Sequence, residues 1–225
     1  MPTTPAAPAE TPRRILATRN RGWARALAGV LARSGVRPNA VSLTGVLFAA
    51  SAAGFLYVAA NPAPGAEGLS VASWLCAAAC VQLRLLCNLL DGMLAVEQGL
   101  KSKTGELYND LPDRVADVLI LTAAGYSTSA AFGPILGWTA SVLALFTAYV
   151  RVLAGSLGLT QHFIGPMAKQ HRMFTLTLAS LGAATEVVLE LPPRVMTASL
   201  VLIVLGSAIT TARRVSRVAA EARLR

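Results

Sequence analysis

Six of the eleven acidic residues of this chain fall within one segment, residues 88–117, although the sequence on both sides is almost continuously apolar. These six are Asp91, Glu97, Glu106, Asp110, Asp113 and Asp117. An ionisable side chain at membrane depth costs about 2.5–3.5 kcal/mol by insertion scales, so a cluster of them usually has a function. Carboxylates that face each other in a partly dry site require a cation. Oxygen ligands without His or Cys favour a hard divalent ion such as Mg²⁺, Mn²⁺ or Ca²⁺, which bridges and polarises phosphate oxygens.

At about 100° per residue on a helix, the polar residues of this region form two stripes. The first stripe contains Arg84, Asn88, Asp91, Gly92 and Ala95, and the second contains Asn109, Asp110, Asp113 and Asp117. A short loop joins the two helices, so we expect the stripes to face each other, with nearby glycines that let a phosphate-bearing ligand approach the backbone. The alternative is a solvated hairpin whose acids pair with Lys101, Lys103, Arg114 and Arg84. The hairpin is favoured for Glu97 and Glu106, and the site for Asp91, Asp113 and Asp117.

The elements that carry these stripes are expected to be membrane helices. Of the 225 residues, 54% are hydrophobic and 14% are charged, whereas charged residues make up about 25% of an ordinary soluble domain. A transmembrane helix needs roughly 20 mostly apolar residues. Six segments meet this rule: 40–60, 69–95, 107–129, 133–155, 171–191 and 195–212. The sequence therefore predicts an all-α integral membrane protein with about six transmembrane helices.

The positive charges indicate how these helices are oriented. Segments 61–68 and 127–134 contain no Lys or Arg and segment 191–194 contains only Arg194, whereas the alternate loops and both termini are basic. By the positive-inside rule, both termini and the acidic segment face the cytoplasm, as we expect for a bacterial inner-membrane protein. The net charge of +9 is accounted for by this topology and by attraction to anionic lipid. No nucleic-acid partner is expected, because no soluble domain is available to carry one.

The expected organisation is one membrane domain with short flanking segments. Residues 1–12 are rich in Pro, Ala and Thr and are expected to be a disordered tail. Residues 13–37 are expected to form an amphipathic interfacial helix, with an apolar stripe of Leu16, Trp23, Leu27, Val30 and Leu31. The transmembrane domain covers 38–215 and a basic cytoplasmic tail covers 216–225. Pro38 suits a helix start, with Ser42 able to help with capping.

A second group of basic residues follows the acidic segment. Arg151 lies near the cytoplasmic end of the fourth predicted span, and Lys169 and Arg172 lie just before the fifth. For Lys169 and Arg172, a loop that is basic only because it faces the cytoplasm explains the sequence as well as a phosphate contact does. Arg151 is embedded in apolar sequence, so a role in a site is favoured for it.

The acidic segment resembles the motif of the CDP-alcohol phosphotransferase family, which includes phosphatidylglycerophosphate, phosphatidylserine and phosphatidylinositol-phosphate synthases. The family motif is D-x2-D-G-x2-A-R-x8-G-x3-D-x3-D. The chain keeps every spacing and reads Asn88-x2-Asp91-Gly92-x2-Ala95-Val96-x8-Gly105-x3-Asn109-x3-Asp113. Asn88 and Asn109 stand where the family has metal-binding aspartates, and Val96 stands where it has arginine. The RPNAVSLTG segment at the first span, the six spans and the interfacial helix also fit the family.

The resemblance implies a transferase that moves a phosphoryl-linked group from a CDP-linked lipid or alcohol to a hydroxyl and releases CMP. It implies Mg²⁺ or Mn²⁺ bound by Asp91 and Asp113, with Asn88 and Asn109 in the remaining motif positions. Asp113 would be the base that activates the acceptor. Because Asn neutralises no charge, we expect Asp110 and Asp117 to restore the ligand count and Arg84 to replace the motif arginine.

The same resemblance assigns the pockets on either side. Gly92, Ala95 and Gly105 would line the CDP pocket together with Arg84, and Arg151, Lys169 and Arg172 would hold the acceptor or its phosphate. It also implies a homodimer in the lipid bilayer. The alternative is a relative that binds CDP-lipid or a partner enzyme without turnover.

Overall fold

The structure is a computed structural model that describes residues 22–97 and 105–224, without the side chains at positions 96, 97, 105, 106 and 109. The described residues form helices and no strand: α1 (Gly22–Arg33), α2 (Pro38–Ala60), α3 (Glu67–Glu97), α4 (Gly105–Tyr126), α5 (Gly133–Ser156), α6 (Lys169–Val188) and α7 (Val195–Ala222). The predicted all-α fold is confirmed. The expected tail at 1–12, the first part of the interfacial helix and the loop residues Gly99, Lys101 and Lys103 lie outside the described residues.

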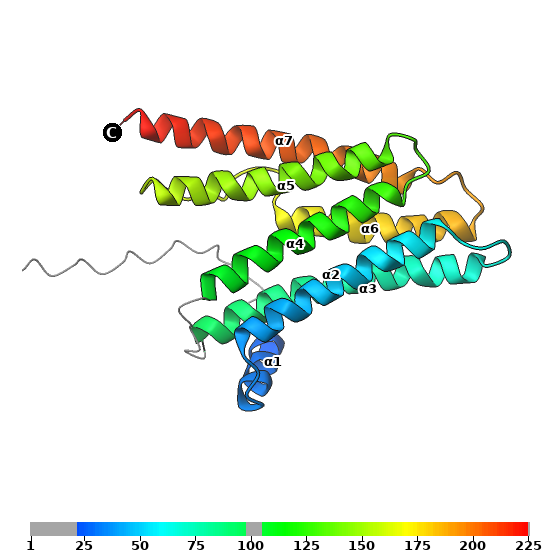
Figure 1. Cartoon of the computed structure of the whole chain (residues 1–225), viewed down its shortest axis with the longest axis horizontal. Helices are drawn as coiled ribbons and strands as arrows, with labels where there is room; N and C mark the ends of the chain where they lie inside the picture. Colours follow the sequence, from blue (N-terminus) through cyan, green and yellow to red (C-terminus); the bar gives the residue numbers. More distant parts are fainter. Residues whose placement is uncertain (1–21, 98–104, 225) are drawn as a thin grey trace, which may run out of the picture.

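Helices α2 to α7 close into a bundle (Figure 1). Successive helices are in contact around a ring in the order α2, α3, α6, α7, α5, α4 and back to α2. The end of α3 and the beginnings of α4 and α6 lie toward the same end of this bundle. The core is apolar and rich in alanine. Such small residues let helix backbones approach closely, as is typical of helix packing in membranes.

Glycines lie at close approaches between neighbouring helices, including α4, which carries the second polar stripe. A Cβ added at Gly125 of α4 would lie 2.7 Å from the Gly137 Cα of α5. A Cβ added at Gly45 of α2 would lie 3.3 Å from the Cβ of Cys87 in α3. The α4–α5 contact therefore has no room for a side chain, and it sets the position of α4 against its neighbours.

Helix α1 is the described part of the predicted interfacial helix and stands steeply to α2 and α3, from whose side of the bundle it projects (Figure 1). It packs against α3. Ala24 and Ala28 are fully buried there, with Leu27 and Leu31 partly buried beside them, whereas Trp23 is half exposed. Its orientation and its exposed apolar residues suit a helix that lies in a membrane interface.

Four of the described helices are long and apolar enough to cross a membrane: α2, α3, α5 and α7. Helices α4 and α6 fall short of that measure because both carry charged residues. Most of their exposed side chains are nevertheless apolar, as at Val115 of α4 and Phe174 and Leu178 of α6, whereas Asp117 and Arg172 are buried. The protein is therefore an integral membrane protein, and in α4 and α6 the charges of Asp117 and Arg172 are directed into the bundle.

The start of α2 differs in detail from the sequence expectation. Pro38 is the first helical residue, as predicted, and Arg37 is the N-cap. The cap makes no side-chain hydrogen bond. The Ser42 hydroxyl lies 3.3 Å from the carbonyl oxygen of Pro38 and donates to Asp91 Oδ2 at 2.7 Å. Ser42 thus connects α2 to the acidic residues of α3, and does not cap the helix.

Candidate functional site

The two polar stripes face each other, as the sequence predicted. Arg84 of α3 donates from Nη2 to Asp117 Oδ1 at 2.9 Å and to Asp113 Oδ1 at 3.3 Å. The same nitrogen also donates to the backbone carbonyl of Asp113 at 3.0 Å. One turn along α3, Asn88 Nδ2 lies 3.0 and 3.1 Å from the two carboxylate oxygens of Asp113. The spacing of four residues on each helix produces this paired arrangement.

Helix α6 supplies two further cations to the same carboxylates. The Lys169 ammonium donates to Asn88 Oδ1 at 2.8 Å and forms an ion pair with Asp113. Arg172 Nη2 forms an ion pair with Asp117 Oδ2 at 2.9 Å. Arg84, Arg172 and Asp117 are each only 1% exposed. Asp117 is therefore held between two guanidinium groups inside the bundle.

The segment that leads into Lys169 is attached to α7. The backbone N–H of Met167 donates to the Thr210 hydroxyl at 2.9 Å. Earlier in the segment, the backbone N–H and the hydroxyl of Thr160 donate to Glu221 at 3.0 and 2.9 Å. These contacts fix the backbone just before α6, and they thereby fix the position from which Lys169 reaches Asp113.

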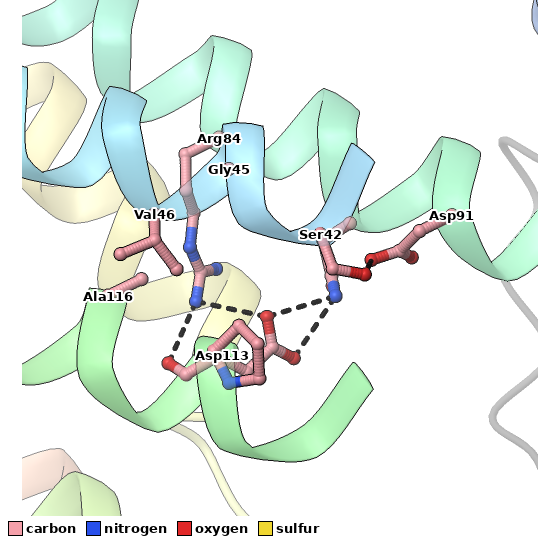
Figure 2. A pocket seen from close by; sticks show the side chains of 9 residues that line it. Ser42, Gly45, Val46, Arg84, Asp91, Asp113 and Ala116 are labelled. Carbon is pink, nitrogen blue, oxygen red and sulfur yellow. Dashed lines mark hydrogen bonds and ion pairs between the residues drawn. The ribbon is translucent and has the colours of Figure 1, made fainter. Parts of the chain in front are cut away.

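A small pocket opens beside these contacts, between α2, α3 and α4. Its lining residues are Ser42, Gly45, Val46, Arg84, Asn88, Asp91, Pro112, Asp113 and Ala116. Figure 2 shows Arg84 and Asp113 facing each other and Ser42 next to Asp91. Arg84 Nη1 and Asp91 Oδ1 are buried without a hydrogen-bond partner among the described residues. Both residues line the pocket, so a polar ligand that reached these two atoms would gain by supplying the missing hydrogen bonds.

A second cluster lies nearer the start of α4. Asp110 Oδ1 accepts from Arg114 at 2.8 Å and from Arg151 of α5 at 3.0 Å. The Arg151 guanidinium also lies 5.6 Å from the ring centroid of Phe163, within cation–π distance. These groups are more exposed than Asp117, with Asp110 at 39% and Arg151 at 24%. Of the basic residues that the sequence singled out after the acidic segment, Arg151 is therefore the one most exposed to solvent.

Protein groups occupy most carboxylate oxygens of the site, with Asp91 Oδ1 as the exception, and this arrangement does not fit the divalent-metal site that the motif resemblance implies. Asp113, Asp117 and Asp110 each bind two or more basic or amide groups of the protein itself. Among the described side chains, no group of three or more His, Cys, Asp or Glu is arranged to hold a metal ion. Asp110 and Asp117, expected from the sequence to restore the ligand count, are each neutralised by two arginines. Their role as metal ligands stays a prediction that these contacts do not support.

Some site residues are outside this description, and others were not anticipated. The side chain of Asn109 is not described, and Gly105 is the first residue of α4. Gly92 and Ala95 lie part-buried on α3. Ser42 was expected only to help start a helix. Its place in RPNAVSLTG, a segment that the resemblance already singled out, was the one available signal for its contact with Asp91.

The fold and site together define a class: an all-α integral membrane protein with a charged site inside the bundle. The same fold occurs in the phosphatidylinositol phosphate synthase of Mycobacterium tuberculosis solved with CDP-DAG bound. The TM-score is 0.68 at 21% sequence identity, and the match covers 87% of this chain and 92% of that chain. For that synthase in complex with manganese and citrate the TM-score is 0.69 at 19% identity, covering 87% and 88%. For the apo form it is 0.65 at 21% identity, covering 84% and 93%.

At these identities the likeness shows the fold. It agrees with the motif, because phosphatidylinositol-phosphate synthases are among the enzymes of the family that the sequence resembles. No protein-family model matches the chain, and no curated protein does either.

Proposed function

We propose that this protein is a membrane phosphotransferase of phospholipid biosynthesis. It transfers a phosphatidyl or other substituted phosphate group from a CDP-linked donor to a hydroxyl acceptor and releases CMP. One observation carries the proposal. Asp91 and Asp113, from the two halves of the motif, line one pocket in a bundle with the fold of a synthase solved with CDP-DAG bound.

In the proposed reaction the acceptor oxygen bonds to the phosphorus that carries the transferred group, and the bond from that phosphorus to the CMP oxygen breaks. The acceptor proton passes to the carboxylate of Asp113. Arg84 Nη1 suits a phosphate oxygen, and Asp91 Oδ1 suits a hydroxyl of the ligand, because both atoms are buried and unpartnered. Positive charge at Lys169 and Arg84 stabilises the leaving CMP. The proposed reaction needs no divalent ion, because protein cations and amides already bind both oxygens of Asp113 and of Asp117.

The acceptor is proposed to bind beside Arg151, which is partly exposed and next to the second cluster. Arg172 is buried against Asp117, so its proposed role is to hold the site and not to touch the acceptor. We further propose that α4 and α6 also cross the bilayer, since most of their exposed residues are apolar. The site would then face the cytoplasm of a bacterium, and the chain would act as a homodimer, as the resemblance implies.

The test is CMP release by the purified full chain in lipid nanodiscs. CDP-diacylglycerol and soluble CDP-alcohols are offered with a panel of hydroxyl acceptors, each with Mg²⁺, with Mn²⁺ and with EDTA. We expect release that depends on an acceptor, and a loss of about 100-fold or more in Asp113→Asn, the size associated with a general base. The exposed Glu190→Gln is the matched control. Absence of CMP release with every pair of donor and acceptor refutes the transferase.

A second candidate function is binding of a CDP-lipid without turnover. The contacts at Asp113 favour it, because both carboxylate oxygens already accept from Asn88, and Arg84 and Lys169 bind them as well. Protein groups therefore already occupy the carboxylate that would have to accept the proton of the acceptor. Saturable binding of CDP-diacylglycerol with no CMP release identifies this second function.

A further inference from the structure

Three polar contacts of the site form a triangle between three helices. Its corners are Asn88 of α3, Asp113 of α4 and Lys169 of α6. Asn88 Nδ2 donates to Asp113, the Lys169 ammonium donates to Asn88 Oδ1 at 2.8 Å, and the ammonium is ion-paired with Asp113. The ammonium therefore lies between the oxygens of two motif positions, as a bound cation would.

The side chain at position 88 suits an ammonium better than it suits a metal. An aspartate there would place a second carboxylate beside that of Asp113, an arrangement that needs a strong cation. Asparagine instead presents an NH₂ group to the carboxylate and an oxygen to the ammonium. Each polar atom of Asn88 consequently has a partner of the correct kind. The departure from the family motif at Asn88 thus matches the presence of Lys169.

The charges of the inner site already balance. Asp91, Asp113 and Asp117 supply the negative charge. Arg84, Lys169 and Arg172 supply an equal positive charge. Divalent ions would add further positive charge to a buried site in which, among these three carboxylates, only Asp91 Oδ1 lacks a protein partner.

The ammonium is also held in place before any ligand arrives. Lys169 is the first residue of α6, directly after the segment that Thr210 and Glu221 of α7 attach to the bundle. Its side chain is 18% exposed, and that of Asp113 is 15% exposed. A group fixed in this way stabilises a ligand's charge without reorganising.

We propose that the Lys169 ammonium replaces the divalent cation of this site, and that the pocket binds the diphosphate of its ligand without metal. The identity of the ligand rests on the proposed function. The replacement of the divalent cation by Lys169 does not depend on it. Asn88 and Lys169 act together in it: the amide orients the carboxylate of Asp113 and the ammonium supplies the positive charge.

The experiment titrates the purified full chain with Mn²⁺ alone and measures free Mn²⁺ by electron paramagnetic resonance. Wild type and Asp91→Asn are expected to give the same curve, without a saturable site. Asn88→Asp combined with Lys169→Met is expected to gain a saturable site, about tenfold or more tighter, the order by which one group near a metal changes affinity. Adding Asp91→Asn to that variant should abolish the gain. Lys169→Arg with Asn88 unchanged keeps a cation and should gain nothing.

A saturable Mn²⁺ site in wild type that Asp91→Asn removes overturns the proposal. This comparison needs no variant at Lys169, so it decides the matter even where the double variant does not fold. A second measurement is binding of CDP to wild type in EDTA and in Mn²⁺, which should have equal dissociation constants. Tighter binding by tenfold or more in Mn²⁺ also overturns the proposal. Failure of the proposed function shows as absent CDP binding and absent CMP release, and leaves the Mn²⁺ titration unaffected.

Discussion

Asp117→Asn should destabilise the protein strongly, because it breaks a buried network of three charges. Asp117 Oδ1 and Oδ2 each lie 2.9 Å from a guanidinium nitrogen, of Arg84 and of Arg172. An asparagine has one oxygen and one NH₂ group, so it accepts from one arginine and presents donors to the other. Arg84 keeps its ion pair with Asp113 at 3.3 Å, whereas the guanidinium of Arg172 stays buried and has lost the anion of Asp117.

The expected cost is about 3 kcal/mol, at the lower end of the range for breaking a buried ion pair by removing one partner. The lower end applies because both arginines keep other acceptors. Arg84 retains the backbone carbonyl of Asp113 at 3.0 Å, and Arg172 retains the carbonyl of Met167 at 3.2 Å. Asp110→Asn is the matched control. Its carboxylate also binds two arginines but is 39% exposed, so the cost should be about 0–1 kcal/mol.

The assay is equilibrium unfolding of the purified chain in mixed micelles of rising SDS content, followed by tryptophan fluorescence. Trp74 is buried in the core and reports its loss. Asp117→Asn combined with Arg172→Met should recover part of the stability, because it removes the stranded cation. The reasoning fails if Asp117→Asn is no less stable than Asp110→Asn. It also fails if the second substitution deepens the loss.

Two further predictions concern the scaffold that holds the site. Gly137→Ala should destabilise the bundle by about 1–3 kcal/mol in the same assay, because its Cβ would lie 2.8 Å from the Gly125 Cα. Gly54→Ala is the control and should be nearly neutral, because nothing lies within 4 Å of its Cβ. Equal stability of the two variants would contradict the close approach of α4 and α5. Glu186→Ala should cost about 1–2 kcal/mol, because Glu186 Oε1 accepts from the N–H groups of Arg194 and Val195 at the start of α7. Glu186→Gln keeps an acceptor oxygen and should cost less than half as much, whereas equal losses would show that the hydrogen bonds do not matter.

Much of the architecture follows from local patterns in the sequence. Apolar segments of about 20 residues predicted α2 to α6 to within a few residues, because a helix that faces lipid needs a continuous apolar surface. The last segment was predicted to end at residue 212, whereas α7 continues to Ala222. The spacing of Arg84 and Asn88 on one helix and of Asp113 and Asp117 on the next predicted stripes that face each other, and the hydrogen bonds confirm it. The role of Glu186 was not predicted, since its partners lie beyond a turn whose geometry the sequence does not state.

The sequence by itself determined that the chain is a helical membrane protein with a polar site formed by two consecutive helices. It could do so because helix formation and helix-face periodicity depend on residues a few positions apart. Only the tertiary structure decided which charges meet. Lys169 reaches Asn88 across 81 positions, and Arg172 reaches Asp117 across 55. Such pairs depend on how α6 is rotated and displaced against α3 and α4, which the packing of the whole ring fixes.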